Sequence, residues 1–336
     1  MTYEALLIVS FGGPEKPEEV MPFLENVLHG RNVPRERMLQ VAEHYYHFGG
    51  RSPINDQCRA LLAALDTELK AHGPSLPIYW GNRNWHPMLA DTLRQMRGDG
   101  IRRALALATS AFGSYSGCRQ YLEDLERARA SIGEGAPEIH KLRSFYNHPG
   151  FIEAMTDRVR TALEQLPAER RSLARLVFTA HSIPVSMAQS SPYVAQLQEA
   201  RDLVCEALGR PPADLVYQSR SGPPNQPWLE PDICDYIRRL RSSDLVVAPI
   251  GFLSDHMEVV YDLDTEAAAL CRDLGVNLVR AGTVGVHPAF IRALRELILE
   301  RTAGHERRAL GALGPGPDQC PADCCLPARP APRGQA

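Results

Sequence analysis

The feature that most constrains this 336-residue chain is a repeated order of short apolar runs, each followed by a turn and then by an amphipathic helical pattern. Such runs stand at residues 5–10, 78–81, 104–109, 176–180, 215–218, 245–251 and 277–280. Runs that are apolar throughout are typical of parallel strands covered on both faces. Their alternation with helices predicts a doubly wound α/β fold.

The same order of elements occurs twice, with a seam near residues 145–150. We therefore expect an N-terminal α/β half over residues 1–145 and a C-terminal half, with a final helix, over residues 146–303. Open α/β sheets bind ligands at the carboxyl ends of their strands, so a site is expected in a cleft between the halves. Residues 304–336 hold six prolines and little apolar periodicity, which predicts an irregular tail that only its cysteines would hold in place.

Composition excludes several classes of protein. The formal net charge is −3 and the isoelectric point is about 6.4, which argues against a nucleic-acid binder with a broad basic face. No apolar run approaches the roughly 18 residues of a membrane-spanning segment, so at most a peripheral membrane contact is expected. The first residues lack the basic and apolar segments of a signal peptide, which favours a cytoplasmic protein.

The chain lacks the glycine-rich motifs of nucleotide-binding α/β proteins. Its first run ends in Phe-Gly-Gly-Pro rather than G-x-G-x-x-G, and no G-x-x-x-x-G-K-[ST] occurs. Residues 113–117 resemble a serine-hydrolase nucleophile elbow only superficially, because the central residue is Tyr115. Serine hydrolysis is therefore a weak competitor.

A histidine stands where the fourth of these runs ends. His181 directly follows the run 176–180, in Thr-Ala-His-Ser-Ile-Pro. A lone histidine is usually a core or capping residue, but strand ends face the cleft in this architecture. A neutral imidazole in that place can accept a proton or coordinate a metal at pH 7.

A row of carboxylates follows the run 245–251. Glu258, Asp262 and Glu266 are spaced by four residues, which predicts that they share one face of a helix. Taken alone, such a row is most often a solvated acidic face. Its apolar neighbours leave little of this helix free to be surface, so a path for a divalent cation or for departing protons is the competing interpretation.

Eight cysteines occur, and three of them crowd into the last seventeen positions. Scattered single cysteines are typical of a reducing compartment. The cluster of Cys320, Cys324 and Cys325 favours a metal or redox centre over a disulfide framework. A zinc site and a disordered tail with free thiols remain alternatives.

Together these segments resemble the ferrochelatases, the enzymes that insert ferrous iron into a porphyrin late in haem synthesis. The resemblance covers roughly residues 3–300, and the combination is most similar to the actinobacterial branch. The fold of that family is two Rossmann-like halves without a nucleotide. The motifs that carry the resemblance stand at residues 7–14 (LIVSFGGP), 48–53 (FGGRSP), 81–87 (GNRNWHP), 179–184 (TAHSIP), 218–227 (QSRSGPPNQP) and 249–264 (PIGFLSDHMEVVYDLD).

The resemblance implies roles for individual residues. His181 matches the family's active-site histidine and Glu258 its partner carboxylate, and both are expected to meet the Fe²⁺ substrate. Asp262 and Glu266 match the acidic row that relays metal or protons. The segments around Ser52 and Tyr121 resemble those that contact the porphyrin.

Two further expectations concern anionic groups and sulfur. Arg51, together with Ser52, stands at a predicted helix start, where a porphyrin propionate would be favoured. Many ferrochelatases carry a [2Fe–2S] cluster on C-terminal cysteines plus one upstream cysteine. The resemblance therefore implies a cluster on Cys118 together with Cys320, Cys324 and Cys325, since four thiolates are the usual requirement.

The expected reaction is insertion of Fe²⁺ with release of two pyrrole protons. We expect His181 to accept protons or to hand iron to the ring, and Glu258 to share the metal or the proton. A porphyrin or haem carrier without turnover and a cobalt or nickel tetrapyrrole chelatase are the alternatives. The polar segment 43–54 and the actinobacterial resemblance favour coproporphyrin III over protoporphyrin IX as substrate, and the oligomeric state is open.

Overall fold

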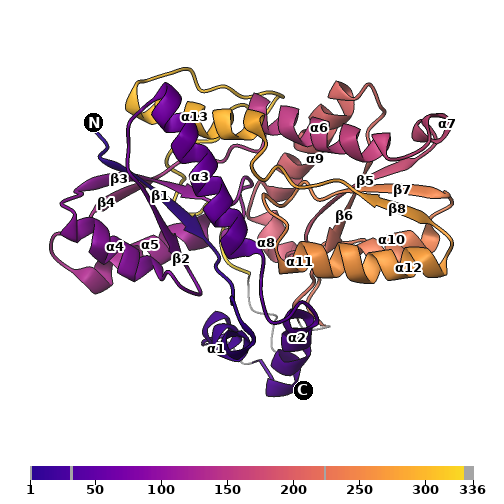
Figure 1. The fold of residues 1–336 in the computed structure, drawn as a ribbon, viewed down its shortest axis with the longest axis horizontal. Coiled ribbons are helices and arrows are strands. Elements are labelled where there is room, and N and C mark those ends of the chain that lie inside the picture. The colour runs from indigo at the N-terminus through magenta and orange to yellow at the C-terminus, as the bar shows by residue number, and fades with distance from the viewer. Residues whose placement is uncertain (1, 31–32, 223–224, 329–336) are drawn as a thin grey trace.

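The computed structural model describes residues 2–30, 33–222 and 225–328, and it contains two four-stranded parallel sheets flanked by helices (Figure 1). The first sheet has the order β2-β1-β3-β4, with β1 at Ala5–Ser10, β2 at Ile78–Asn82, β3 at Arg103–Ala108 and β4 at Glu138–Lys141. The second has the order β6-β5-β7-β8, with β5 at Arg175–His181, β6 at Asp214–Gln218, β7 at Asp244–Ala248 and β8 at Asn277–Arg280. The predicted doubly wound α/β class is confirmed.

Helices connect the strands in both halves. Those of the N-terminal half are α1 (Pro17–Val27), α2 (Arg35–His47), α3 (Ile54–His72), α4 (Leu89–Gly98), the π-helix η1 (Tyr115–Arg119) and α5 (Gln120–Ile132). Those of the C-terminal half are α6 (Pro149–Glu164), α7 (Ala168–Arg171), α8 (Val185–Gln189), α9 (Tyr193–Ala207), α10 (Ile233–Arg239), α11 (Met257–Val259), the π-helix η2 (Val260–Ala267), α12 (Ala268–Asp273) and α13 (Pro288–Thr302).

The apolar runs form the central strands because both of their faces are covered. In β1, Leu6 and Ile8 join the core that contains α3 and α13, whereas Leu7 and Val9 pack with α4 and α5 on the other face. All six residues of β1 are buried. A strand covered on both faces has no polar side, which is why the run shows no alternation.

One apolar core extends through both halves. It contains Leu6 of β1, Phe178 of β5 and Leu297 of α13. The final helix α13 contacts α6 of its own half and α3 of the other half, as Figure 1 shows. The two sheets are therefore held at a fixed separation by shared packing.

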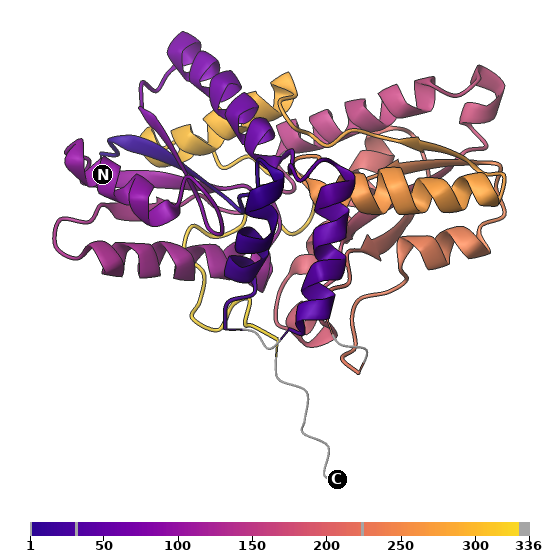
Figure 2. The same ribbon diagram turned by 60° about the horizontal axis from the view of Figure 1, so that its bottom comes forward.

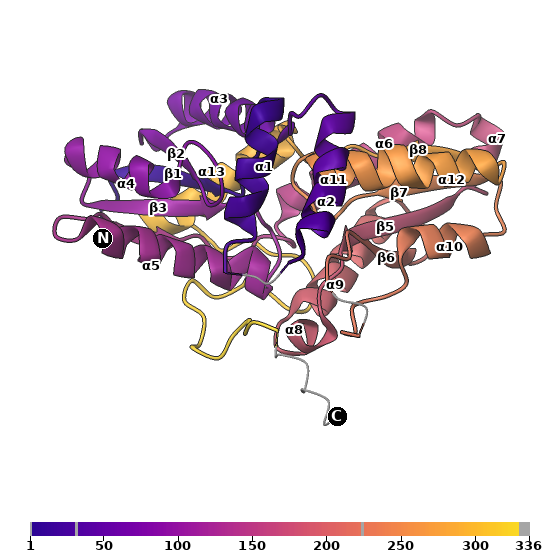
Figure 3. The ribbon, with the colours of Figure 1, turned by 90° about the horizontal axis from the view of Figure 1, so that it is seen from below.

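Helices α1 and α2 lie side by side and reach from the N-terminal half to the C-terminal half (Figures 2 and 3). The ring of His44 on α2 stacks on the ring of Tyr261 on η2, with centroids 3.7 Å apart and an angle of 9° between the planes. The C-terminal end of α2 thus lies directly beside the helix that carries the acidic row.

The tail over residues 304–328 has no regular secondary structure, as expected, but the expectation that only its cysteines hold it is wrong. Glu199 accepts hydrogen bonds from the backbone N–H groups of Ala312 (2.7 Å) and Leu313 (2.9 Å). The Asn147 amide donates to the carbonyl oxygens of Leu310 and Gly314. Figure 3 shows the tail passing beneath α5 toward α8. Expected tail residues 329–336 lie outside the described ranges.

None of the helices in the described ranges combines the length and the apolar character that a membrane-crossing segment requires.

Candidate active site

His181 is the last residue of β5, a central strand of the second sheet. The buried strand ends here, and the chain then turns through Ser182 toward α8. The hydroxyl of Tyr193 donates to the backbone oxygen of His181 at 3.0 Å, and His181 Nδ1 contacts the carbonyl oxygen of Ser182. The imidazole is therefore fixed at the carboxyl end of the sheet, where sites of this architecture lie.

Glu258 comes to the same place from the short helix α11, after the loop that follows β7. His181 Nε2 and Glu258 Oε1 are 3.5 Å apart, although 77 positions separate the two residues along the chain (258 − 181). Their side chains are 30% and 49% exposed, so a substrate can reach both. The two side chains therefore lie together, as their expected roles require.

The electrostatic coupling of these two groups fixes their charge. Desolvation disfavours the imidazolium, but the charge and hydrogen bond of Glu258 outweigh it and raise the pKa of His181 to about 9. Desolvation likewise opposes ionisation of Glu258, but His181 lowers the pKa of that carboxyl to about 2. At neutral pH the two side chains form an imidazolium–carboxylate pair.

The acidic row is present, but the helix that carries it is not the expected α-helix throughout. Val260–Ala267 is a π-helix, a rare form that is frequent at functional sites. Desolvation, Glu258 and Glu266 raise the pKa of Asp262 to about 7, against a hydrogen bond from Ser219 that lowers it. Desolvation and Asp232 raise the pKa of Glu266. The carboxylates thus act on one another, and Asp262 titrates near neutral pH.

The sequence interpretation missed several residues around this pair. His256 caps α11 by accepting from the Glu258 N–H at 3.2 Å, and desolvation lowers the pKa of its imidazole. The Gln218 amide donates to the Glu258 carbonyl oxygen at 3.0 Å. Desolvation and the charge of Glu258 raise the pKa of Tyr45 on α2. His256 and Gln218 stand inside the quoted motifs, but Tyr45 could not be placed here from sequence.

The expected porphyrin contacts occupy different environments. Arg51 is exposed and pairs with Asp56 at 2.5 Å, just before α3. Ser52 is only 4% exposed, and its Oγ accepts from the Ile54 N–H at 3.4 Å. Tyr121 is 5% exposed and lies in the N-terminal core, with the Arg83 guanidinium 4.6 Å from its ring centre. Its role as a porphyrin contact stays a prediction.

Cys118 on η1 lies beside the tail that carries Cys320, Cys324 and Cys325. Cys118 hydrogen-bonds Cys320, which lowers the pKa of Cys118 to about 6, with a smaller contribution from Lys141. The sulfurs of Cys324 and Cys325 are 3.4 Å apart. Within residues 2–30, 33–222 and 225–328, no three His, Cys, Asp or Glu side chains surround a point closely enough to hold one metal ion.

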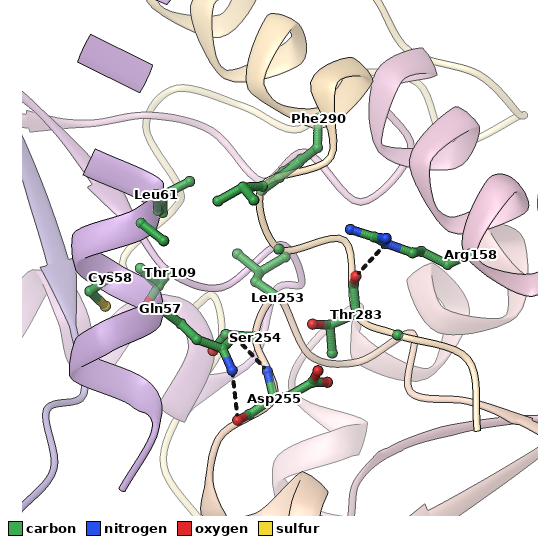
Figure 4. A pocket seen from close by; sticks show the side chains of 14 residues that line it. Gln57, Cys58, Leu61, Thr109, Arg158, Leu253, Ser254, Asp255, Thr283 and Phe290 are labelled. Carbon is green, nitrogen blue, oxygen red and sulfur yellow. Dashed lines mark hydrogen bonds between the residues drawn. The ribbon is translucent and has the colours of Figure 1, made fainter. Parts of the chain in front are cut away.

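Two cavities are notable in the described part of the chain. One of about 290 Å³ is formed by both halves and is lined by Gln57, Leu253, Asp255, Thr283 and Phe290, among others (Figure 4). The other, of about 400 Å³, lies near Glu15, Arg59 and Trp85. Neither is lined by His181 or Glu258.

Comparison with known proteins gives relatives that are all named as ferrochelatases. The chain is 56% identical to a ferrochelatase of Rhodopirellula baltica over 335 residues, which cover 98% of this chain and 95% of the relative. It is 53% identical to a coproporphyrin III ferrochelatase of Streptomyces coelicolor, covering 99% of this chain and 96% of that one.

A solved structure supports the fold. The sirohydrochlorin chelatase of Bacillus subtilis subspecies spizizenii matches with a TM-score of 0.54 at 14% identity, over 90% of this chain and 96% of that one. The sequence model of the family described as Ferrochelatase matches residues 3–302. The chain therefore belongs to the ferrochelatase family, the porphyrin metal chelatases.

Proposed function

We propose that this chain inserts Fe²⁺ into coproporphyrin III, with release of two pyrrole protons, in haem biosynthesis. The observation that carries the proposal is the 3.5 Å approach of His181 to Glu258 at the carboxyl end of the second sheet. A carrier that only binds porphyrin has no need of such a pair. Relatives that are about half identical over nearly their whole length are named coproporphyrin III ferrochelatases, which supports the choice of porphyrin.

Insertion requires a group that accepts pyrrole protons. At neutral pH His181 is protonated, because the Glu258 carboxylate raises its pKa to about 9 after desolvation is overcome. His181 must therefore lose a proton before it accepts one from the porphyrin. The arriving Fe²⁺ dication favours that loss, since a nearby cation lowers the pKa of an imidazole.

The protons need a route away from the ring. Asp262 has a pKa of about 7, so it can take up and release a proton at neutral pH. Glu266 lies beyond it and, with Asp262, completes a relay toward solvent. In this proposal His181 and Glu258 also contact the metal, because imidazole with one carboxylate is a moderate ligand set for Fe²⁺.

The propionate edge of the porphyrin is proposed to meet Arg51 and Ser52. Arg51 is exposed and would exchange Asp56 for a propionate. A guanidinium and a carboxylate form a charge-assisted hydrogen bond of fixed geometry. Ser52 lies next to Arg51 at the start of α3, where an anion is also favoured.

The choice of porphyrin predicts a substrate preference. We expect kcat/KM for anaerobic Fe²⁺ insertion to be at least about tenfold higher for coproporphyrin III than for protoporphyrin IX, because each further charge-assisted hydrogen bond contributes about 1.5 kcal/mol. The two porphyrins are compared side by side by the appearance of the metalloporphyrin spectrum. Equal values, or a preference for protoporphyrin IX, would contradict the proposal.

We further propose that the four thiols bind a [2Fe–2S] cluster. In such a cluster each iron takes two protein ligands, so two pairs of thiols fit it better than one group around a single point. Cys118 with Cys320 and Cys324 with Cys325 form two pairs, and their charges also interact between the pairs. When bound, a cluster supplies thiolate crosslinks between Cys118 and the tail. We also propose a cytoplasmic location, which the scattered single cysteines of the sequence support.

Loss of one thiol is the test of the cluster. Anaerobically purified protein is expected to be red-brown, with about two irons and two acid-labile sulfides per chain. Cys118→Ser should abolish the sulfur-to-iron absorption, whereas Cys234→Ser, a control on α10, should leave it unchanged. A colourless wild-type protein that contains zinc would show that the cluster assignment is wrong.

A further inference from the structure

The side chain of Gln57 joins the two halves of the molecule next to the active site. Gln57 lies on α3, and its Nε2 donates to the Asp255 carbonyl oxygen at 2.8 Å. The Asp255 N–H donates back to Gln57 Oε1, also at 2.8 Å (Figure 4). One carboxamide therefore pairs with both backbone groups of a residue 198 positions away, in the way that one strand pairs with another.

The Asp255 side chain continues this connection into the C-terminal half. Its carboxylate accepts from Arg280 at the end of β8, at 2.9 Å. The same guanidinium donates two hydrogen bonds, of 2.5 and 2.9 Å, to Asp264 on η2. The position of Asp255 is thereby linked to the helix that carries the acidic row.

Glu258 follows Asp255 by only three residues, and its backbone carbonyl oxygen also accepts a hydrogen bond from the Gln218 amide at 3.0 Å. The α-helical turn that carries it, α11, has three residues and passes directly into the π-helix η2. Glu258 therefore lies in the first turn of a continuous helical segment, residues 257–273, and its position depends on where that segment begins. Its start is set by the His256 cap, one residue after Asp255.

A cavity borders the place where Gln57 and Asp255 form their two hydrogen bonds. The cavity of about 290 Å³ borders Gln57 and Asp255, together with Leu253 and Thr283 (Figure 4). Fewer packed atoms therefore support the contact on that side than in a filled core. The two hydrogen bonds of the carboxamide therefore make the larger share of the contact on that side.

We propose that Gln57 is a positioning residue for metal insertion: it holds the Ser254–His256 segment from the opposite half so that Glu258 faces His181. The inference rests on the proposed function through the role given to Glu258. In the described residues Gln57 has no hydrogen bond or ion pair with His181 or Glu258, so it acts through the backbone of Asp255. Gln57 thus makes the geometry of the pair depend on the correct docking of the two halves.

Two substitutions separate the hydrogen bonds from the bulk of the side chain. Gln57→Met keeps the length of the side chain and removes both the donor and the acceptor. Gln57→Glu keeps the acceptor but places a second acceptor against the Asp255 carbonyl oxygen. Gln95→Met is the matched control, because Gln95 is an exposed residue on α4.

The readout is the single-turnover rate of Fe²⁺ insertion into bound coproporphyrin III, with the Kd for the porphyrin measured separately by fluorescence quenching. We expect Gln57→Met and Gln57→Glu to lower the rate about tenfold, because small misplacements of a catalytic group have effects of this size. The Kd should stay within about twofold of the wild-type value, and it also shows that the variants fold. Gln95→Met should change neither quantity.

A double-mutant cycle distinguishes positioning from a general structural role. If Gln57 acts through Glu258, Gln57→Met should have no further effect in a Glu258→Gln background. An unchanged rate in Gln57→Met, or the same tenfold loss in both backgrounds, overturns the inference while leaving the role of Glu258 intact. A near-normal rate in Glu258→Gln alone overturns the proposed role of Glu258, and this inference with it.

Discussion

Replacement of His181 by alanine is expected to lower the single-turnover rate of Fe²⁺ insertion by about 10³-fold, because a positioned acid–base group contributes about 10²- to 10⁴-fold. The variant lacks both the group proposed to accept pyrrole protons and one proposed contact to the metal. Porphyrin binding should change little, since the contacts proposed for the propionates, Arg51 and Ser52, are kept. The rate is measured anaerobically with coproporphyrin III at saturating concentrations of both substrates.

The control for this substitution is His305→Ala, which removes an exposed imidazole from the tail. It should insert iron at the wild-type rate. If His181→Ala also retained near-normal insertion, the histidine would have no part in proton or metal transfer.

Replacement of Glu258 by glutamine is expected to slow insertion by a similar factor and to shift its pH dependence. In the wild-type protein His181 has a pKa of about 9, because the Glu258 charge overcomes desolvation, so the rate should rise as the pH approaches 9. Glutamine removes that charge, and the pKa of His181 should fall toward its ordinary value of about 6.5. The rising limb of the rate should therefore move to lower pH by more than one unit.

Glu126→Gln on α5 is the matched control, because Glu126 is exposed. This substitution should change neither the insertion rate nor the pH at which the rate rises. An unshifted limb in Glu258→Gln would mean that Glu258 does not set the protonation of His181.

The His181–Glu258 pair also makes the stability of the folded protein depend on pH. Desolvation lowers the pKa of His181, but Glu258 outweighs it and raises that pKa to about 9. The contribution of His181 to the free energy of unfolding is therefore complete below pH 6.5 and is lost as the pH rises through about 9. Desolvation raises the pKa of Glu258, but His181 outweighs it and lowers that pKa to about 2. The stabilisation from the pair is therefore also lost as the pH falls from 4.5 toward about 2. In thermal unfolding, Glu258→Gln should therefore lower Tm near pH 6 and have no effect through this pair above about pH 10.

The sequence predicts those strands that are buried on both faces of their sheet. The run at residues 5–10 is the strand β1, and the other six runs each coincide with a strand to within a few residues. The strand β4, Glu138–Lys141, was missed because its sequence is Glu-Ile-His-Lys and it lies at the edge of its sheet. Edge strands tolerate charged residues, so they lack the apolar signal.

The sequence predicts the two principal site residues, His181 and Glu258, better than it predicts the residues around them. His181 follows a strand and Glu258 follows the loop after another, and the carboxyl ends of parallel strands meet at one edge of a sheet. That rule places the two motifs together without any knowledge of distances. The hydrogen bonds of Gln57 with Asp255 and the influence of Glu258 on the pKa of Tyr45 involve α3 and α2, whose docking onto the other half depends on packing of the whole chain.

The acidic helix shows where sequence periodicity misleads, and the tail shows what periodicity does not report. Spacing by four residues predicted one α-helical face for Glu258, Asp262 and Glu266, but the backbone widens into η2 from Val260 onward. The tail lacks periodicity, which correctly predicted irregular structure. Its attachment to Asn147 and Glu199 uses single polar side chains that leave no pattern in the sequence.

The central claim is that His181 and Glu258 act as one unit on the iron, and a double-mutant cycle on the single-turnover rate of Fe²⁺ insertion tests it most directly. Residues that act as a unit have strongly non-additive effects. The account predicts that His181→Ala/Glu258→Gln is no more than about threefold slower than the slower single variant. Losses that multiply, so that the double variant is slower by the product of the two single effects, would contradict it.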